Sequence, residues 1–380
     1  MDVSLLPMRT DDDQAPGAIL LMSTIETIVN SQNHALVTIV IINYNYADYL
    51  AAAIDSALAQ DYPSIQVIVV DDGSVDRSRD IIESYGSSVE AVYRPNKGHS
   101  AALNTGYAHA RGDYVLFLDA DDLLYPTCIL TAHRHLMPGD VKIQFQLETI
   151  DPQGVSQAMA FPYFSAALTP AEVRRQSLLS GWYAWTVSTG NLYCRQYLDA
   201  VLPVDDTRIY RSPDGYLNKL APLFGNVRSL AIPLGAYRVH GRNQWASAAG
   251  AWDIGTAVRW LKFEGALEEA FLRVAALRGI AVRRPLLSSF HQLESRILVL
   301  RFAKDRPLPN DSRGKAIAAA LNWLLYLRTD GWAGGIGRLC WLLFLAFAPR
   351  DMALAQIRVA RAQSGRSLFW RWAVNWTRRR

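Results

Sequence analysis

The chain has 380 residues, of which 50% are hydrophobic and 11% aromatic, and its formal net charge is +4. This composition excludes wholesale disorder and permits a large core, in one large domain or two ordinary ones. The three cysteines are far apart and form no CxxC motif, which argues against a disulfide framework and a cysteine zinc site and is typical of a reducing compartment.

Residues 1–35 are predicted to be a flexible leader. Asp11, Asp12 and Asp13 stand where a signal peptide would need basic residues. A transmembrane helix needs about 18 or more consecutive apolar residues, and the longest approach, Leu339 to Pro349, is too short. We therefore expect neither a signal peptide nor a transmembrane helix.

From residue 36 onward, apolar strands alternate with helices of about a dozen residues. Strands are predicted within 36–45, 65–74, 89–95 and 113–122, and helices at 49–60, 76–86 and 99–112, the first of them capped by Asp48. Such alternation specifies an α/β fold with a parallel sheet and right-handed crossovers. Because the strands are apolar throughout, the sheet should be covered on both faces.

Polar residues follow three of these strands: Asn43–Asn45, Asp71–Asp72 and Asp119–Asp122. In sheets of this kind ligands bind beyond the carboxyl ends of the strands. The three clusters should therefore meet on one rim of the sheet and form a ligand site.

The third cluster, Asp119-Ala120-Asp121-Asp122, is strongly acidic. Carboxylate oxygens suit Mg²⁺ or Mn²⁺, and Mg²⁺ typically binds one or two carboxylates together with substrate phosphates. A cation would also offset the mutual repulsion of these carboxylates. The alternative is a surface turn whose aspartates cap a helix.

Several segments together resemble the family 2 glycosyltransferases, which are inverting enzymes with the GT-A fold. They are TIVIINYNYADYL, IDSALAQDYP, VIVVDDGSVDRS, NKGHSAALNTGYAHARGDYVLFLDADD, SPDGYLNKL and YRVHGRN, within residues 37–245. The resemblance implies a Rossmann-like, mixed but mainly parallel sheet flanked by helices over residues 36–250. It also implies transfer of a sugar, of the hexosyl or N-acetylhexosaminyl type, from a nucleotide-diphospho-sugar.

The resemblance assigns the donor-binding roles as follows. The nucleotide-sugar would contact Asn43, Tyr44, Asn45, Asp71, Asp72, Asn96, Lys97, Gly98, Asn104, Asp119 and Arg238. Among these, Asp71 would meet the base, and a carboxylate there accepts the imide N–H of uracil but finds no proton on the cytosine ring nitrogen. This favours a UDP-sugar. Leu103 departs from the family, in which many members carry a basic residue before the asparagine.

The metal, Mg²⁺ or Mn²⁺, would be held by Asp121 as the principal ligand, with Asp119 and His240. Asp119 is alternatively a ribose ligand, and His240 alternatively a diphosphate ligand. Asp122 is expected only to cap the segment that follows. Arg238 and Arg242 would pair with phosphate oxygens, for which the guanidinium geometry is suited.

By the same resemblance, Asp214 is the catalytic base, because an inverting enzyme needs a carboxylate to take the proton of the attacking hydroxyl. Pro213 replaces the acidic residue that usually precedes it. The alternative for Asp214 is an ordinary helix cap. Trp182, Tyr183 and Trp185 are candidates for stacking on a sugar ring, and the alternative for them is the hydrophobic core.

Residues 251–380 lie outside the resemblance and are predicted to form an α-helical region, with helices at 254–278, 286–304, 313–328, 332–348 and 350–376. Residues 351–380 contain seven arginines and one aspartate. Arginine beside tryptophan-rich apolar faces is typical of a helix on anionic lipid. The alternative is a helical cap on the catalytic domain. Nucleic acid is not expected as a partner, because no recognition module is present.

The sequence therefore predicts an inverting glycosyltransferase that uses a nucleotide-diphospho-sugar, with UDP favoured. Its acceptor would be a saccharide or a lipid-linked molecule in cell-surface polysaccharide or glycoconjugate synthesis. The expected location is the cytoplasm, either free or peripheral on the inner face of the membrane. Two alternatives stay open: a non-catalytic sugar-nucleotide-binding scaffold, and a sugar-nucleotidyltransferase, although the first strand lacks the glycine-rich basic loop expected of the latter.

Overall fold

The computed structural model describes residues 35–162, 164, 168–209, 212–241, 243, 253–305, 307–308, 310–326 and 331–362. The predicted leader, apart from Ala35, and the end of the last predicted helix lie outside these residues. By its contacts, Leu36–Arg380 forms one compact unit.

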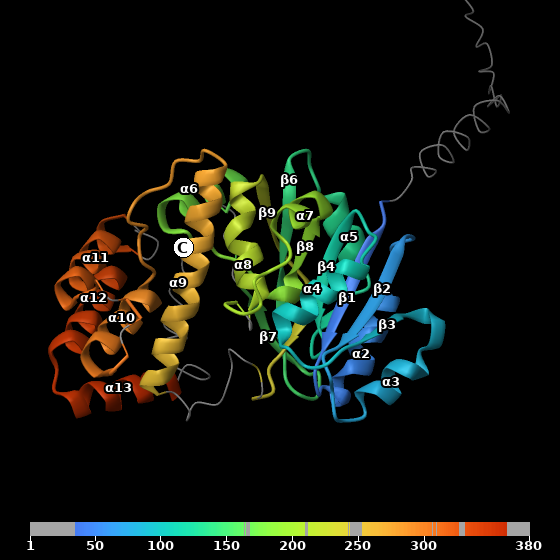
Figure 1. The fold of residues 1–380 in the computed structure, drawn as a ribbon, viewed down its shortest axis with the longest axis horizontal. Coiled ribbons are helices and arrows are strands. Elements are labelled where there is room, and N and C mark those ends of the chain that lie inside the picture. The colour runs from blue at the N-terminus through green and yellow to red at the C-terminus, as the bar shows by residue number, and fades with distance from the viewer. Residues whose placement is uncertain are drawn as a thin grey trace, which may run out of the picture. The chain divides into compact units, whose positions relative to one another are not determined.

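A nine-stranded mixed sheet organises this unit (Figure 1). Its path runs β3-β2-β1-β4-β8-β6-β9-β5, and β7 pairs with β6 off this path. The strands are β1 (Val37–Asn43), β2 (Ile65–Asp71), β3 (Glu90–Tyr93), β4 (Tyr114–Asp119), β5 (Leu123–Leu124), β6 (Asp140–Ile150), β7 (Ser156–Phe161), β8 (Asn191–Cys194) and β9 (Asn226–Arg238).

The strands β3, β2, β1 and β4 are parallel, as the alternating pattern predicts. Asn43 pairs with Asp71, and Ile42 pairs with Asp119, so these strands end level with one another. Beyond β4, the antiparallel β8 joins the sheet, and β6 and β9 then run parallel to each other. The expected α/β fold with a mixed sheet is confirmed, and the three polar clusters lie on one rim.

Helices flank the sheet on both faces. They are α2 (Ala47–Leu58), α3 (Ser78–Ser84), α4 (His99–His109), α5 (Cys128–Arg134), α6 (Pro170–Ser180), α7 (Arg195–Val201) and α8 (Pro213–Leu220), with short 3₁₀ turns η1 (Gly86–Ser88), η2 (Ser188–Gly190) and η3 (Ala221–Leu223). The predicted cap of the first helix is wrong: α2 begins at Ala47, so Asp48 lies in its first turn. The Ala47 N–H donates instead to the Asp76 carboxylate (3.0 Å).

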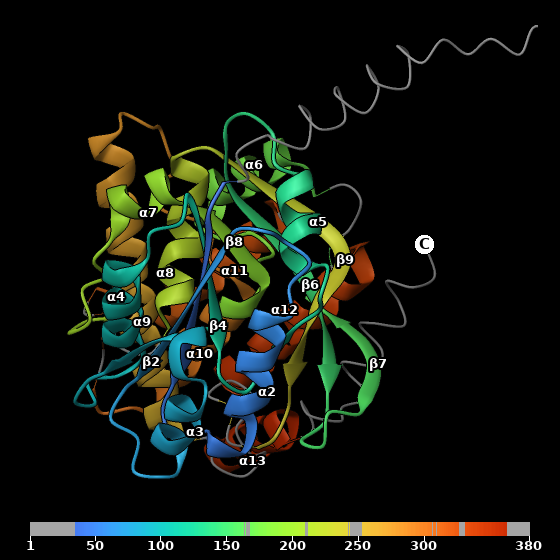
Figure 2. The ribbon, with the colours of Figure 1, turned by 90° about the vertical axis from the view of Figure 1, so that its right-hand side faces the viewer.

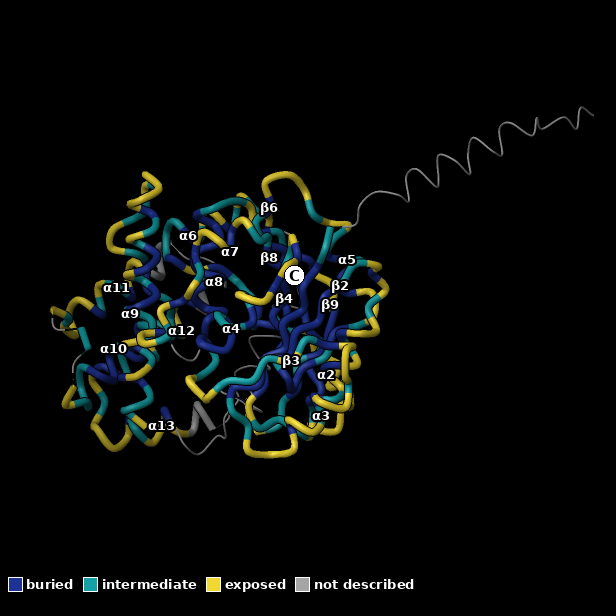
Figure 3. The backbone as a smooth tube through the Cα atoms, turned by 45° about the vertical axis from the view of Figure 1, so that its right-hand side comes forward, coloured by how far each residue is buried: buried dark blue, intermediate teal, exposed yellow. Residues whose placement is uncertain are grey.

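Alternate residues of β1 face two hydrophobic clusters. Val40 and Ile42 pack on the side of α4, whereas Ile39 and Ile41 pack on the side of α2. This division follows from the two-residue period of a strand. Figure 3 shows the sheet as a buried centre with the exposed chain around it. The two-sided burial that the apolar strands predict is confirmed.

The helices after residue 253 are α9 (Ile254–Leu277), α10 (Phe290–Phe302), α11 (Arg313–Tyr326), α12 (Gly331–Phe347) and α13 (Arg350–Ala362). Their described bounds agree with the predicted helices within a few residues. Figures 1 and 2 show α10–α13 grouped together, with α9 between them and the sheet in Figure 1. Within the described residues, no helix is both long enough and apolar enough to cross a membrane.

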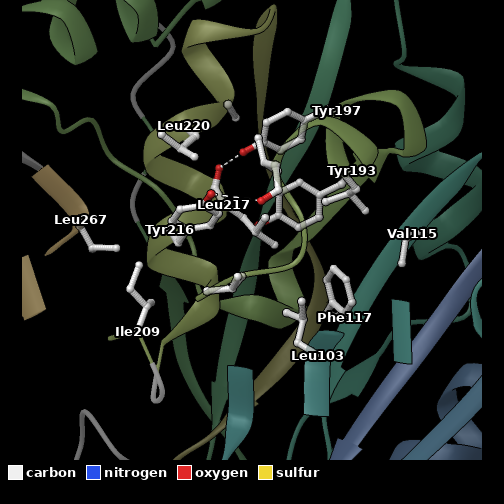
Figure 4. Packing of buried hydrophobic residues seen from close by; sticks show 14 of the residues in the cluster. Leu103, Val115, Phe117, Tyr193, Tyr197, Ile209, Tyr216, Leu217, Leu220 and Leu267 are labelled. Atoms are coloured by element: carbon white, nitrogen blue, oxygen red, sulfur yellow. Dashed lines mark hydrogen bonds between the residues drawn. The ribbon is translucent and has the colours of Figure 1, made fainter. Parts of the chain in front are cut away.

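Helix α9 packs on α8 within the same hydrophobic cluster as the sheet. Leu267 and Phe271 of α9 share this cluster with Tyr216 and Leu217 of α8. Figure 4 shows Leu267 facing this helix, and on its other side the Tyr197 hydroxyl donating to the Leu217 carbonyl. The position of α8 therefore depends on contacts from the C-terminal region as well as from the sheet.

Candidate functional site

The ends of β1 and β2 are joined by side-chain hydrogen bonds. Asn43 Nδ2 donates to Asp71 Oδ1 (2.8 Å), and the Ser74 hydroxyl donates to the same oxygen (2.5 Å). Asp71 Oδ2 accepts from the Ser74 N–H (3.0 Å). A carboxylate oxygen accepts two hydrogen bonds, so Oδ2 has room for a ligand N–H. Asp71 is thus part of the rim framework and retains the capacity expected for a base contact.

Asn45 fastens the segment after β1 to the segment after β2. Its φ is +58°, and its side chain accepts a hydrogen bond from the Val75 N–H (2.8 Å). Asparagine tolerates this left-handed conformation better than most residues. Tyr44, between Asn43 and Asn45, is 45% exposed, the accessibility that a nucleotide-contacting ring requires.

Asp72 anchors the loop that precedes α4. Its two carboxylate oxygens accept from the N–H groups of Lys97 (3.2 Å) and Gly98 (2.8 Å), and Arg94 lies 3.4 Å away. Gly73 has φ of +76°, and a Cβ on it would lie 2.7 Å from the Asn96 nitrogen. Asp72 therefore holds the loop before α4 through hydrogen bonds to its backbone. Lys97 of this loop is exposed at the rim of the sheet.

The three aspartates at and after the end of β4 have different partners. Asp122 is fully buried, and it accepts hydrogen bonds from the Thr189 hydroxyl (2.6 Å) and the Arg238 N–H (3.0 Å). Asp121 Oδ2 lies 2.8 Å from His240 Nε2. Asp119 Oδ1 lies 3.4 Å from His99 Nε2. Asp122 thus ties β4 to η2 and β9, whereas Asp119 and Asp121 carry imidazole neighbours.

His240 is held by aromatic rings. It stacks on Tyr49 at 5.1 Å between ring centroids and meets Tyr46 edge-on at 5.5 Å. Its side chain is almost fully buried. The structure thus brings Asp121 and His240 together from sequence positions far apart, as the resemblance implies.

The guanidinium of Arg238 contacts other groups of the protein. Its guanidinium donates to the carbonyls of Asp121 (2.9 Å) and Pro152 (3.1 Å) and lies 4.8 Å above the Tyr49 ring. A 5% exposed arginine with these partners positions the acidic loop. The predicted phosphate contact of Arg238 stays a prediction, and Arg242 lies outside the described residues.

Burial and mutual repulsion destabilise the charged forms of the carboxylates in the acidic cluster. Burial, together with the charges of Asp121 and Asp214, raises the pKa of Asp119 well above its usual range. Burial, with Asp121 and Asp119, does the same to the pKa of Asp122. A nearby positive charge would oppose both effects.

Whether a divalent cation fits here can be tested on the donor groups. Among the described residues no group of three His, Cys, Asp or Glu side chains is already arranged around a common metal position. The oxygen and nitrogen donors that Mn²⁺ and Mg²⁺ bind are nevertheless present in Asp119, Asp121 and His240. A bound cation would also stabilise the charged forms of Asp119 and Asp122, whose pKa values are raised. These residues fit the expected cation.

Asp214 lies in the first turn of α8 and is 9% exposed. Ser212 precedes the helix, and its hydroxyl donates to Asp214 Oδ1 (2.5 Å). The charge of Asp214 raises the pKa of Asp119, so the two carboxylates lie within electrostatic range. The role of Asp214 as the base stays a prediction.

The remaining predicted residues divide between core and surface. Asn104 is clamped to the backbone of Val204, whose carbonyl accepts from Nδ2 (2.9 Å) and whose N–H donates to Oδ1 (2.9 Å). Tyr183 is fully buried, which supports the core alternative for that ring. Trp182 is 47% exposed and lies 5.8 Å from Trp185, so this pair remains available to a sugar.

Sequence reasoning missed several residues that hold the site. Ser74 bonds both Asn43 and Asp71, and Asn243 donates to the Arg238 carbonyl (2.7 Å). A signal existed for Ser74, since it follows Asp71, Asp72 and Gly73 directly. The Thr189 hydroxyl, which donates to Asp122 (2.6 Å), carried no such signal in the sequence.

Comparison with known proteins adds an independent finding. A model of the family described as Glycosyl transferase family 2 matches residues 38–143. An uncharacterised glycosyltransferase of Nostoc sp. is 34% identical over 225 residues, which are 57% of this chain and 68% of that protein. One from Rickettsia typhi is 48% identical over 124 residues, which are 32% of this chain and 39% of that protein. The chain thus spans two thirds of one relative and well under half of the other.

Solved structures resemble the chain more loosely. Staphylococcus aureus TarS 1–349 in complex with UDP-GlcNAc aligns with a TM-score of 0.44 and 18% identity, over 87% of this chain and 91% of that one. The mannosyltransferase PcManGT from Pyrobaculum calidifontis, in complex with GDP-Man and Mn²⁺, aligns with a TM-score of 0.46 and 18% identity, over 91% and 93%. At this level of similarity neither structure decides which donor this chain uses.

Proposed function

Because this chain belongs to glycosyl transferase family 2 and is a glycosyltransferase, we propose that it transfers a sugar with inversion from a nucleotide-diphospho-sugar. The acceptor we propose is a saccharide or a lipid-linked molecule in cell-surface polysaccharide or glycoconjugate synthesis. The observation that carries the proposal is the contact of Asp121 Oδ2 with His240 Nε2 at 2.8 Å, which joins two of the predicted donor-site residues at the rim of the sheet.

The donor that the rim favours is a UDP-sugar. Asp71 Oδ2 has room to accept the uracil imide N–H, and Tyr44 is exposed beside it. Lys97, exposed on the loop held by Asp72, supplies positive charge for the diphosphate. These groups come from the ends of neighbouring strands, where ligands of such sheets bind.

A bound Mg²⁺ or Mn²⁺ would be held by Asp119, Asp121 and His240, and it would stabilise negative charge on the departing diphosphate. The chain's own carboxylate performs the proton step. Asp214 takes the proton of the acceptor hydroxyl as its oxygen attacks the anomeric carbon, and the bond from that carbon to the diphosphate oxygen breaks. The products are the glycosylated acceptor and the nucleoside diphosphate.

The test compares two variants with a matched control. Asp214→Asn should lower sugar transfer about 100-fold or more, because general base catalysis contributes about that much, and it should leave donor binding intact. Asp121→Ala should lose the Mn²⁺-dependent part of donor binding, measured by calorimetry with UDP, GDP and their sugars. The control is Asp61→Asn, an exposed aspartate at the opposite ends of the strands, which should match the wild type.

The outcomes separate the alternatives. Full transfer by Asp214→Asn would refute its role as base. A wild-type chain that binds donor but glycosylates no acceptor in a broad panel would favour the scaffold. Formation of a sugar nucleotide from a sugar phosphate and a nucleoside triphosphate would favour the nucleotidyltransferase.

We also propose that the chain is cytoplasmic and peripheral on the inner face of an anionic membrane, through α12. Along this helix Ile336 is 50% exposed, Phe347 is 68% exposed, and Cys340 between them is exposed. Leu343 is half-buried on the same helical face. We call these residues the α12 stripe.

Two observations favour lipid as the partner of the α12 stripe. First, apolar side chains that recur at this spacing normally face a hydrophobic core. In α12 a different face, with Leu342 and Leu345, packs into the hydrophobic core, so the α12 stripe is left exposed. Second, residues 351–380, which follow α12 in the sequence, contain seven arginines and one aspartate. The excess positive charge of this segment would attract anionic headgroups.

A further inference from the structure

Lys142 on β6 is fully buried. Its Nζ lies 3.0 Å from Gln144 Oε1 and 3.3 Å from Tyr183 Oη, and it also donates to Asn218 Oδ1. None of these three partners is charged. Burying a charged lysine without a carboxylate in contact costs desolvation free energy that hydrogen bonds to neutral groups offset only in part. This cost suggests that Lys142 has a specific role.

Asn218 is the centre of this network. Its Oδ1 also accepts from Tyr193 Oη (3.1 Å), and its carbonyl accepts from Tyr183 Oη (2.8 Å). Its Nδ2 donates to the Thr186 carbonyl (2.9 Å). The amide is therefore fixed from both ends.

These contacts connect the two halves of the proposed site. Asn218 lies one helical turn after Asp214 on α8, so fixing Asn218 fixes the turn that carries the base. Thr186 leads into η2, where Ser188 bonds Asp119 and Thr189 bonds Asp122. One amide thus links the base helix to the segment that holds the donor carboxylates.

We propose that Lys142 and Asn218 are a buried positioning pair, which sets the distance and orientation of Asp214 relative to Asp119. The inference rests on the proposed function, since it takes Asp214 as the base. Neither residue touches the reacting atoms, so both act through Asp214.

The protonation state of Lys142 matters to this pair. An ammonium has three N–H donors, and the three neighbouring acceptors match them. Burial lowers the pKa of Lys142 well below its usual range, and the Asp214 carboxylate opposes this effect. The groups facing the ammonium are Gln144 of β6, Tyr193 of β8, Tyr183 before η2, and Asn218 and Asp214 of α8. Loss of the proton would leave one acceptor unmatched, so transfer should decline as the pH rises through the lowered pKa of Lys142.

The experiment uses the full chain and the variants Lys142→Met, Asn218→Leu and the double variant. Each should lower kcat for transfer about 100-fold, as expected for a small displacement of a reacting group, with donor KM unchanged. Because the residues act as one unit, the double variant should lose no more than either single variant. Lys142→Met should also lose this decline of kcat with rising pH. The matched control is Lys219→Met, the next residue on α8, which is 5% exposed and pairs with Glu264 of α9 (3.6 Å).

The outcomes are distinguishable. If Asp214→Asn transfers normally, the proposed function fails whatever Lys142 does. If Asp214→Asn is impaired but Lys142→Met keeps its kcat and its pH profile, the positioning pair is refuted. Equal losses in Lys219→Met, or additive losses in the double variant, would also refute it. If one single variant does not fold, the double variant keeps the test, because an apolar pair often replaces a buried polar pair without loss of stability.

Discussion

At the scale of single residues, neighbouring carboxylates on the rim have separate tasks. Asp72 and Asp122 accept hydrogen bonds from backbone groups and hold loops, whereas Asp119 and Asp121 lie beside imidazoles. The sequence could predict that these aspartates gather, since strand ends of a parallel sheet meet at one edge. It could not predict which of them face inward, because that depends on Thr189 and Arg238, which are remote in the chain.

The raised pKa of Asp119 predicts how the thermal stability of the protein depends on pH. A carboxyl whose folded pKa is raised stabilises the fold below its ordinary pKa of about 4, and that contribution is lost as the pH rises through the raised value. Asp119→Asn removes one such group, so this variant should gain more thermal stability relative to the wild type at pH 8 than at pH 4. Thermal unfolding without metal at the two pH values measures this difference.

Addition of Mn²⁺ provides the control for that prediction. The cation should raise the unfolding temperature of the wild type at pH 8 and raise that of Asp121→Ala much less. A stability difference between Asp119→Asn and the wild type that does not change with pH would contradict the electrostatic explanation.

At the scale of elements, the strands β1 to β4 and the helices after residue 253 could be predicted because their patterns are local. The insertion of β8 between β4 and β6 could not be predicted, since a four-residue strand gives no clear period. The same limit applies to Lys142 and Asn218, because their significance appears only when β6 and α8 are adjacent. The site was therefore predicted where it follows strand ends and missed where it depends on packing.

The contact of α4 with the sheet gives the second prediction. A Cβ on Gly106 would lie 2.3 Å from Val40 Cγ1 and 3.0 Å from Val70 Cγ2, and both valines are fully buried. Gly106→Ala should therefore destabilise the fold by about 1–3 kcal/mol through overpacking, measured by urea unfolding. Gly265→Ala in α9 is the control: its Cβ meets nothing within 4 Å, so it should gain about 0.5–1 kcal/mol. A Gly106→Ala variant as stable as the wild type would show that α4 can shift.

At the scale of the whole described unit, the C-terminal helices have two different surroundings. Helix α9 shares the hydrophobic cluster of α8, whereas α10 to α13 build a cluster of their own around residues such as Leu298 and Leu345. A division at residue 250 thus stays a prediction, and any truncation there would remove the support of α8. For this reason the membrane proposal is better tested by point substitutions in the full chain.

The α12 stripe gives the third prediction. The double variant Ile336→Ser/Phe347→Ser should bind vesicles of phosphatidylglycerol and phosphatidylcholine at least about tenfold more weakly than the wild type, since each apolar side chain contributes about 1.5–3 kcal/mol when fully buried. Cosedimentation measures the binding. The control is Leu277→Ser, an 81% exposed leucine at the end of α9, which should bind as the wild type does. Equal binding by the double variant would refute lipid as the partner of the stripe, and equal binding to neutral vesicles would refute the attraction to anionic headgroups.

The bonds of Asp122 also bear on the order in which the chain matures. Its partners Thr189 and Arg238 are 67 and 116 residues further along the chain. During synthesis β1, β2 and β4 emerge well before either partner, so the parallel strands can pair while the acidic loop still lacks its anchors. We therefore expect the acidic loop to become fixed last, when β9 joins the sheet. A nascent chain should assemble the parallel strands first, and its acidic loop should gain its anchors together with the strand that leads to His240.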